Sequence, residues 1–288
     1  MTKTPDFFCL GVQKAGTTWL YENMCTHPDF SPPLFKEPHY FDTLYNWVPA
    51  WGPQGSWDLL PLYQRISEVL YWKLIQQKAP CDSETFQYLT KIAALYEAPL
   101  TDAWYAKFFE DCSAGQITGD FTPENCLIND AGIQHLTTVN PAAKYILLLR
   151  DPVERDWAQL RMNLPAESAE QSFLAATREE DFNRRSDYET IILRWRNAVS
   201  PERLYIGFFD DLRERPTELL NAVAAFLGVP QHDWPLACVV SLKGREQAMS
   251  PTIHRRLAYK NSRTLEYMAD AFPNPCRQWK VRHLPLSG

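Results

Sequence analysis

Continuous apolar runs alternate along the chain with segments of helical periodicity. Three apolar runs predict strands that are buried on both faces of a parallel sheet: Phe7–Val12, Lys144–Leu149 and Leu204–Phe209. A fourth, shorter strand is predicted at Gln116–Gly119. Amphipathic or capped segments predict helices at 17–24, 156–162, 170–197, 216–227 and 253–272. This alternation predicts an α/β fold, with one domain over residues 1–288 and a mostly parallel sheet flanked by helices.

The stretch 45–115 departs from the alternation. It is rich in aromatic side chains and prolines, and it holds five tryptophans: Trp47, Trp51, Trp57, Trp72 and Trp104. We interpret it as an insertion of helices and loops after the first strand and helix, near the site where an acceptor would bind. Its aromatic residues could line an organic substrate's pocket or belong to the core, and the sequence leaves both interpretations open.

The segment from Gly11 to Thr18 joins the first strand to the first helix. Glycines permit tight turns in which successive N–H groups point into one concavity, and the helix N-terminus adds its positive dipole end. The G-x-x-x-x-G spacing is that of a P-loop, but Thr17 stands where a Walker A loop has lysine, and Lys14 lies inside the loop. The segment therefore predicts a P-loop-like site for a phosphate or phosphosulfate.

Composition disfavours several classes of protein. The formal net charge is −6, which disfavours a broad basic surface for nucleic acid or acidic lipid. The seven cysteines include no C-x-x-C pair, so we expect no metal site and no disulfide scaffold. No apolar run approaches the ~18 residues of a membrane span, and no signal peptide is apparent at the start. We therefore expect a cytoplasmic location.

Four segments resemble motifs of the sulfotransferases that use 3′-phosphoadenosine 5′-phosphosulfate (PAPS), in the branch that includes heparan sulfate sulfotransferases. They follow one another in the family's order: Gln13–Leu20, Lys36–Asp42, Leu149–Arg155 and Lys243–Arg245. The Lys36–Asp42 segment resembles the branch's K-E-P-H-[FY]-F-D motif. The resemblance implies a P-loop-like α/β fold and an enzyme that moves a sulfuryl group from PAPS, its co-substrate, to an acceptor.

The resemblance also implies roles for particular residues. Lys14 would neutralise the leaving phosphate, and Glu37 would be the general base, with His39 as the alternative base because its ordinary pKa lies nearest neutrality. Arg150 would bind the 3′-phosphate. The residues expected to bind the donor are Lys14, Ala15, Gly16, Thr17, Thr18, Trp19, Arg150, Lys243, Gly244 and Arg245.

Two positions depart from the family pattern. Ala158 stands where the family has a serine that contacts the 3′-phosphate, and Phe121 stands where glycan-specific members often carry a lysine. Loss of that lysine, together with the acidic net charge, disfavours a heavily sulfated polysaccharide as acceptor. We expect a small-molecule or glycoside acceptor, sulfated on a hydroxyl rather than an amine.

Two other interpretations are consistent with the sequence. A P-loop kinase or NTPase would need a lysine after Gly16 and magnesium-dependent turnover of ATP. A non-catalytic nucleotide-binding relative would bind the spent nucleotide without transferring a group to any acceptor. The substitutions at Ala158 and Phe121 are the kind of change such a relative would carry.

Overall fold

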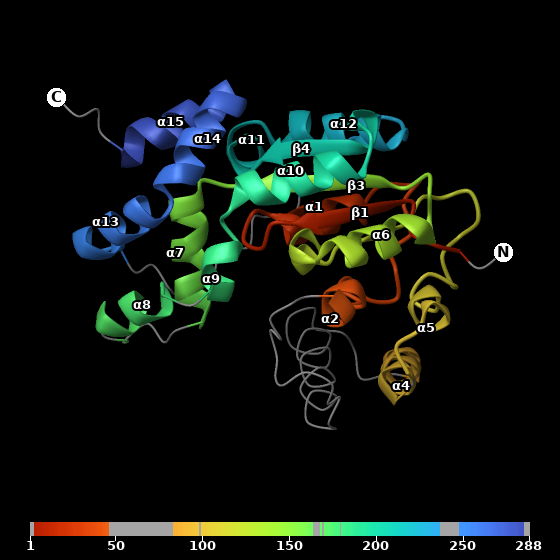
Figure 1. The fold of residues 1–288 in the computed structure, drawn as a ribbon. Coiled ribbons are helices and arrows are strands. Elements are labelled where there is room, and N and C mark those ends of the chain that lie inside the picture. Colours follow the sequence, from red (N-terminus) through yellow and green to blue (C-terminus); the bar gives the residue numbers. More distant parts are fainter. Residues whose placement is uncertain are drawn as a thin grey trace.

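The computed structural model describes residues 3–45, 83–97, 99–163, 168, 170–178, 180–236 and 248–284. Its centre is a four-stranded sheet with the order β2-β1-β3-β4, in which every neighbouring pair is parallel (Figure 1). The strands are β1 (Phe7–Gly11), β2 (Gly119–Asp120), β3 (Lys144–Leu149) and β4 (Leu204–Phe208). The predicted α/β fold is confirmed, and the carboxyl ends of all four strands meet at one edge, where ligands of open α/β sheets bind.

The short strand β2 begins later than the sequence indicates. Ile117, which we expected in the strand, forms an isolated bridge with Phe30 on the segment that follows the first helix. Its N–H donates to the carbonyl of Asp29 and its carbonyl accepts from the N–H of Ser31, each at 2.8 Å. These hydrogen bonds align the chain just before β2, so only two residues pair with β1.

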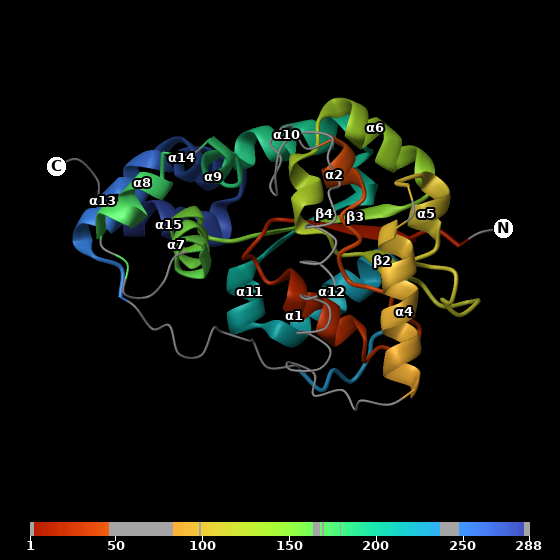
Figure 2. The ribbon, with the colours of Figure 1, turned by 90° about the horizontal axis from the view of Figure 1, so that it is seen from below.

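Helices cover both faces of the sheet (Figure 2). One face carries α1 (Thr17–Met24), α11 (Phe209–Glu214) and α12 (Pro216–Leu227), and the other carries α6 (Asp130–Val139) and α10 (Tyr188–Ala198). The predicted bounds of α1 and α12 are confirmed. Gly228 ends α12 at a φ of 85°, the left-handed conformation that glycine adopts without a steric penalty.

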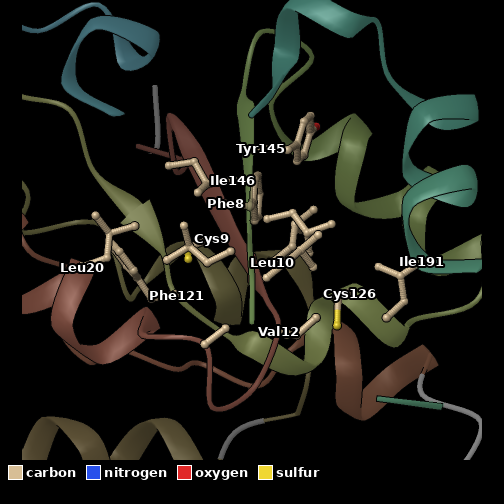
Figure 3. Packing of buried hydrophobic residues seen from close by; sticks show 14 of the residues in the cluster. Phe8, Cys9, Leu10, Val12, Leu20, Phe121, Cys126, Tyr145, Ile146 and Ile191 are labelled. Atoms are coloured by element: carbon tan, nitrogen blue, oxygen red, sulfur yellow. The ribbon is translucent and has the colours of Figure 1, made fainter. Parts of the chain in front are cut away.

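The core explains why the strands read as continuous apolar runs. Successive side chains of β1 point to opposite faces of the sheet, and both faces are covered (Figure 3). Phe8 lies on the face of Tyr145, with the two rings stacked 5.7 Å apart, while Cys9 points toward Leu20 and Phe121. These five side chains are all fully buried.

A second group of helices packs beyond the carboxyl ends of the strands. It comprises α7 (Pro152–Asn163), α8 (Glu170–Ala176), α9 (Glu180–Arg184), α13 (Pro251–Lys260), α14 (Ser262–Ala271) and α15 (Pro273–His283). Helix α7 starts four residues before the predicted 156. The predicted single helix at 170–197 is wrong: it is three helices, because Thr177 bonds back to the carbonyl of Leu174 and Asp187 caps α10. The sequence did not predict α15.

A buried polar cluster explains the break between α13 and α14, which the sequence predicts as one helix over 253–272. The carboxylate of Asp156 on α7 is fully buried and accepts hydrogen bonds from Arg155 at 2.7 and 3.0 Å. It also accepts from Lys260 at 2.6 Å, from Asn261 at 2.8 Å and from Ser186. Asn261 satisfies this carboxylate from the turn between the two helices, so the chain bends there.

The predicted insertion at 45–115 is described only in part. Its described helices are α4 (Ser83–Glu97) and α5 (Asp102–Ala106), while Trp47, Trp51, Trp57 and Trp72 lie outside the described residues. Trp104 is buried and packs edge-on against Phe108 in the core. The described residues also include three short elements: α2 (Phe41–Tyr45) and the 3₁₀ turns η2 (Pro123–Leu127) and η3 (Pro201–Arg203). Within the described parts of the chain, no helix has both the length and the apolar character of a transmembrane segment.

Candidate functional site

The loop after β1 forms a tight concavity at the carboxyl edge of the sheet. Gly16 immediately precedes α1 and has a φ of +94°, and a Cβ there would lie 2.5 Å from a methyl carbon of Leu212 and 3.3 Å from the ring of Phe209. Helix α11 therefore packs directly against this turn, and only glycine fits. The N-terminal N–H groups of α1 follow Gly16, which gives the loop the geometry of an anion site.

The loop residues expected to bind the donor differ in how far their side chains are buried. Lys14 is partly buried, and burial lowers the pKa of its ammonium group, while the nearby charge of Glu37 acts against that lowering. Thr18 is exposed, Thr17 is nearly buried, and Ala15 is fully buried. The side chain of Trp19 is buried in the core, with 4% exposed, so its position in the motif corresponds to packing behind the loop.

A chain of four polar side chains from the K-E-P-H-Y-F-D segment runs beside the loop. Lys36 donates to the hydroxyl of Thr18 at 2.9 Å and also to the carboxylate of Glu37. The other oxygen of Glu37 lies 3.4 Å from Nε2 of His39, and Nδ1 of His39 lies 2.7 Å from Oδ2 of Asp42. The segment thus connects the phosphate loop, a carboxylate and an imidazole in one array.

Electrostatics assigns a charge to Glu37 and to His39. Burial raises the pKa of Glu37, but the charges of Lys36 and His39 outweigh burial and bring it to about 2. Burial lowers the pKa of His39, but the charge and hydrogen bond of Asp42 outweigh that effect and raise it well above its usual 6.5. At neutral pH, Glu37 is therefore a carboxylate and His39 an imidazolium.

A second buried carboxylate, Glu124, approaches the array from η2. Its Oε1 accepts from the side-chain amide of Gln13 at 2.8 Å and from Nη1 of Arg185 at 3.0 Å. The same Nη1 donates to Oε1 of Gln13 at 3.3 Å. Burial raises the pKa of Glu124, and the charge of Arg185 opposes this. Glu124 is therefore held by the phosphate loop on one side and by the residue after α9 on the other.

Glu37, His39 and Glu124 converge, because one oxygen or nitrogen from each lies within 4.8 Å of the others. A set of two carboxylates and an imidazole can hold a metal ion or a polar substrate. Lys36 and Arg185 already neutralise the two carboxylates, which reduces their attraction for a cation. The geometry and charge of the cluster favour hydroxyl chemistry.

Arg150 connects the end of β3 to the phosphate loop. Its Nη1 donates to the carbonyl of Lys14 at 3.2 Å, and its guanidinium lies 4.4 Å from the centre of the Phe209 ring. Nη2 contacts Glu154 at 3.4 Å, and Nε is buried without a hydrogen-bond partner. Ala158 lies two turns along α7 and is nearly buried, so it offers a methyl group where the family motif has a hydroxyl.

Some residues that the sequence analysis singled out are not part of the described site. Lys243, Gly244 and Arg245 fall outside the described residues. Phe121 is fully buried and packs edge-on against Phe7 and Tyr21 at 5.3 and 5.2 Å, so it is a core residue and lines no pocket.

Sequence reasoning also missed the pairing of Glu124 with Arg185. The only local signal is a glutamate directly after Pro123, at the carboxyl edge that follows β2. Its partner lies 61 residues away in the sequence, at a position where an arginine reads as an ordinary solvent-exposed charge. The sequence alone therefore does not predict a contact between Glu124 and Arg185.

Known proteins resemble the chain in both sequence and fold. Carbohydrate sulfotransferase 15 from Mus musculus is 27% identical over 160 residues, and the human protein 26% identical over 159 residues; each match covers 52% of this chain and 26% of the relative. The chain thus spans about a quarter of the length of these curated relatives. A sulfotransferase from Alicyclobacillus acidocaldarius has the same fold, with a TM-score of 0.63, 18% identity, and coverage of 96% of this chain and 99% of that one.

A further structure, the sulfotransferase domain from the curacin biosynthetic pathway, matches with a TM-score of 0.52 and 18% identity, over 81% of this chain and 77% of that one. These likenesses support the fold. The family itself is shown by sequence, because a profile described as the sulfotransferase family matches residues 5–233, most of the chain. The chain belongs to the sulfotransferase family.

Proposed function

We propose that this chain transfers a sulfuryl group from PAPS to a hydroxyl of a small-molecule or glycoside acceptor. The observation that carries the proposal is the placement of a carboxylate, Glu37, beside an anion-binding loop, with Lys36 contacting both. Sulfuryl transfer requires these two elements side by side: a cradle for the phosphosulfate and a group that accepts the attacking hydroxyl's proton.

The proposed reaction assigns one task to each side chain. The acceptor oxygen attacks sulfur while the bond between sulfur and the phosphate's bridging oxygen breaks, and that oxygen keeps the electron pair. Lys14 and the loop N–H groups stabilise the charge on the departing phosphate. Glu37 takes the proton of the acceptor hydroxyl. The 3′-phosphate is assigned to Arg150 at the carboxyl end of β3, because a guanidinium is suited to binding phosphate.

The charges of the array support Glu37 over His39 as the base. The raised pKa of His39 keeps its imidazole protonated, and an imidazolium has no lone pair to accept a proton. Asp42 holds the ring from the opposite side, so His39 is a positive neighbour that orients the Glu37 carboxylate. Family membership disfavours the kinase reading, in agreement with Thr17 at the Walker lysine position.

Calorimetric titration with 3′-phosphoadenosine 5′-phosphate (PAP) in the absence of magnesium tests the donor half of the proposal. We expect wild-type protein to bind, and Lys14→Ala to weaken binding about 10- to 100-fold, the value of a charge-assisted contact to a phosphate. Lys91→Ala is the matched control, because Lys91 is an exposed lysine paired with Asp111 on the surface. Absence of binding, or equal loss in both variants, would contradict the proposal.

Transfer itself is tested by incubating the protein with PAPS and a panel of hydroxyl compounds. Formation of both PAP and a sulfated product separates an enzyme from a nucleotide-binding relative. Glu37→Gln keeps the size of the side chain and removes its basicity, so we expect PAP binding to persist while transfer falls about 10²- to 10⁴-fold, the usual contribution of a general base. Unchanged transfer would exclude Glu37 as the base.

A further inference from the structure

We infer that Glu124 is an acceptor-binding residue and that it selects a vicinal diol, such as the adjacent hydroxyls of a sugar or catechol. This inference rests on the proposed function and specifies its acceptor. The family motifs quoted above assign no role to Glu124, which lies in η2 and is nearly buried.

The contacts of Glu124 orient its carboxylate beside Glu37. Both hydrogen bonds from Gln13 and Arg185 end on the same atom, Oε1. A carboxylate has about four lone-pair sites on two oxygens, and these two bonds occupy about half of them. Because one ligand atom each of Glu124, Glu37 and His39 lie within 4.8 Å of one another, Glu124 faces the reacting hydroxyl that Glu37 would deprotonate.

The number of hydroxyl donors on the acceptor determines whether both carboxylates receive a hydrogen bond. A single hydroxyl carries one proton, and Glu37 accepts that proton during transfer. Glu124 then receives no hydrogen bond from a monohydric alcohol or phenol, although binding of that acceptor displaces water from the carboxylate. A neighbouring hydroxyl supplies the missing donor. In a vicinal diol the two oxygens lie about 3 Å apart, the separation of hydrogen-bonded oxygens, so each can reach a different carboxylate of the pair.

The two carboxylates of the cluster therefore bind different hydroxyls of one acceptor. The sulfuryl group goes to the hydroxyl at Glu37, and the second hydroxyl remains bound to Glu124.

The test compares two pairs of probes that differ by one hydroxyl: 4-nitrocatechol against 4-nitrophenol, and trans-1,2-cyclohexanediol against cyclohexanol. The rate of PAP formation from PAPS gives kcat/KM for each, and calorimetry on the PAP-bound protein gives each probe's Kd. For wild type we expect the diol to be preferred about 10- to 100-fold, the size of one hydrogen bond to a charged group.

Glu124→Gln keeps an acceptor for Gln13 and Arg185 while removing the charge. We expect it to reduce the diol preference to about threefold or less, mainly through KM and Kd, while the monohydric probe changes less than about threefold. Glu110→Gln, at an exposed glutamate after α5, is the matched control and should keep the wild-type ratio.

Equal use of diol and monohydric probes by wild type would overturn the inference. So would an equal loss for both probes in Glu124→Gln, which would show that Glu124 only supports the loop. If the protein binds PAP but sulfates no probe of either pair, the diol assignment is wrong while the donor site stands. Failure to bind PAP would instead overturn the proposed function.

Discussion

The pH dependence of the reaction follows from the contact between Lys36 and Glu37. The pKa of Glu37, about 2, lies roughly two and a half units below its ordinary 4.5, although burial alone would raise it. At about 1.4 kcal/mol per unit, the ionised form is favoured by on the order of 3 kcal/mol relative to a free glutamate. Because 27% of the side chain is exposed, solvent screens part of that energy.

Replacing Lys36 by methionine removes the largest of the attractive contributions to this pKa and leaves the burial in place. We expect the pKa of Glu37 to rise, because burial is then opposed only by the charge and hydrogen bond of His39. A base works only when deprotonated, so its activity is lost as the pH falls through its pKa. Wild type should therefore show a flat kcat/KM from pH 8 down to about pH 4, whereas Lys36→Met should lose half of its plateau rate between about pH 4 and 5.5.

The assay is PAP formation with the best acceptor of the panel, measured from pH 4 to pH 8, with circular dichroism at each pH to confirm that the protein remains folded. Lys36→Arg is the matched control, because it keeps the positive charge and should keep the flat profile. The position of the acidic limb is compared, not the absolute rate, since Lys36 also contacts Thr18 of the loop.

Two results would refute this reasoning. A wild-type rate that increases above pH 6.5 would show that a group with the properties of His39 is the base, because its pKa lies well above that value. Identical profiles for the methionine and arginine variants would show that the charge of Lys36 does not control the ionisation of Glu37.

Two further predictions concern stability. Asp156→Asn should lower the free energy of unfolding by about 3 to 5 kcal/mol in urea titrations, because it leaves buried cations without their carboxylate. Asp130→Asn is the control and should cost under about 1 kcal/mol, because the side chain of Asp130 is 90% exposed. Equal losses in the two variants would contradict the role of burial. Gly16→Ala should lower the melting temperature and PAP affinity, because its Cβ would collide with Leu212. Gly115→Ala has a similar positive φ but open space, so it should show only the smaller backbone penalty and normal PAP binding.

Local signals made much of the fold and part of the site predictable. The loop around Lys14 and Gly16 was recognisable because its glycine, its charge and its place between a strand and a helix are all adjacent in the sequence. The break at Asn261 was not, because the carboxylate that holds it lies 105 residues away. The approach of Glu124 to the phosphate loop depends likewise on a hydrogen bond to Gln13 that spans 111 residues.

The buried pair of Glu124 and Arg185 also limits how this protein can evolve. Each residue is about 5% exposed, so a change at either position that removes the hydrogen-bonding group leaves the other charge in the interior without a partner, which costs several kcal/mol. That is a large share of the marginal stability of a folded domain. A lineage that replaces Glu124 by an apolar residue must therefore alter position 185 as well, and an intermediate with only one of the two changes is selected against for folding before its new specificity can be of use.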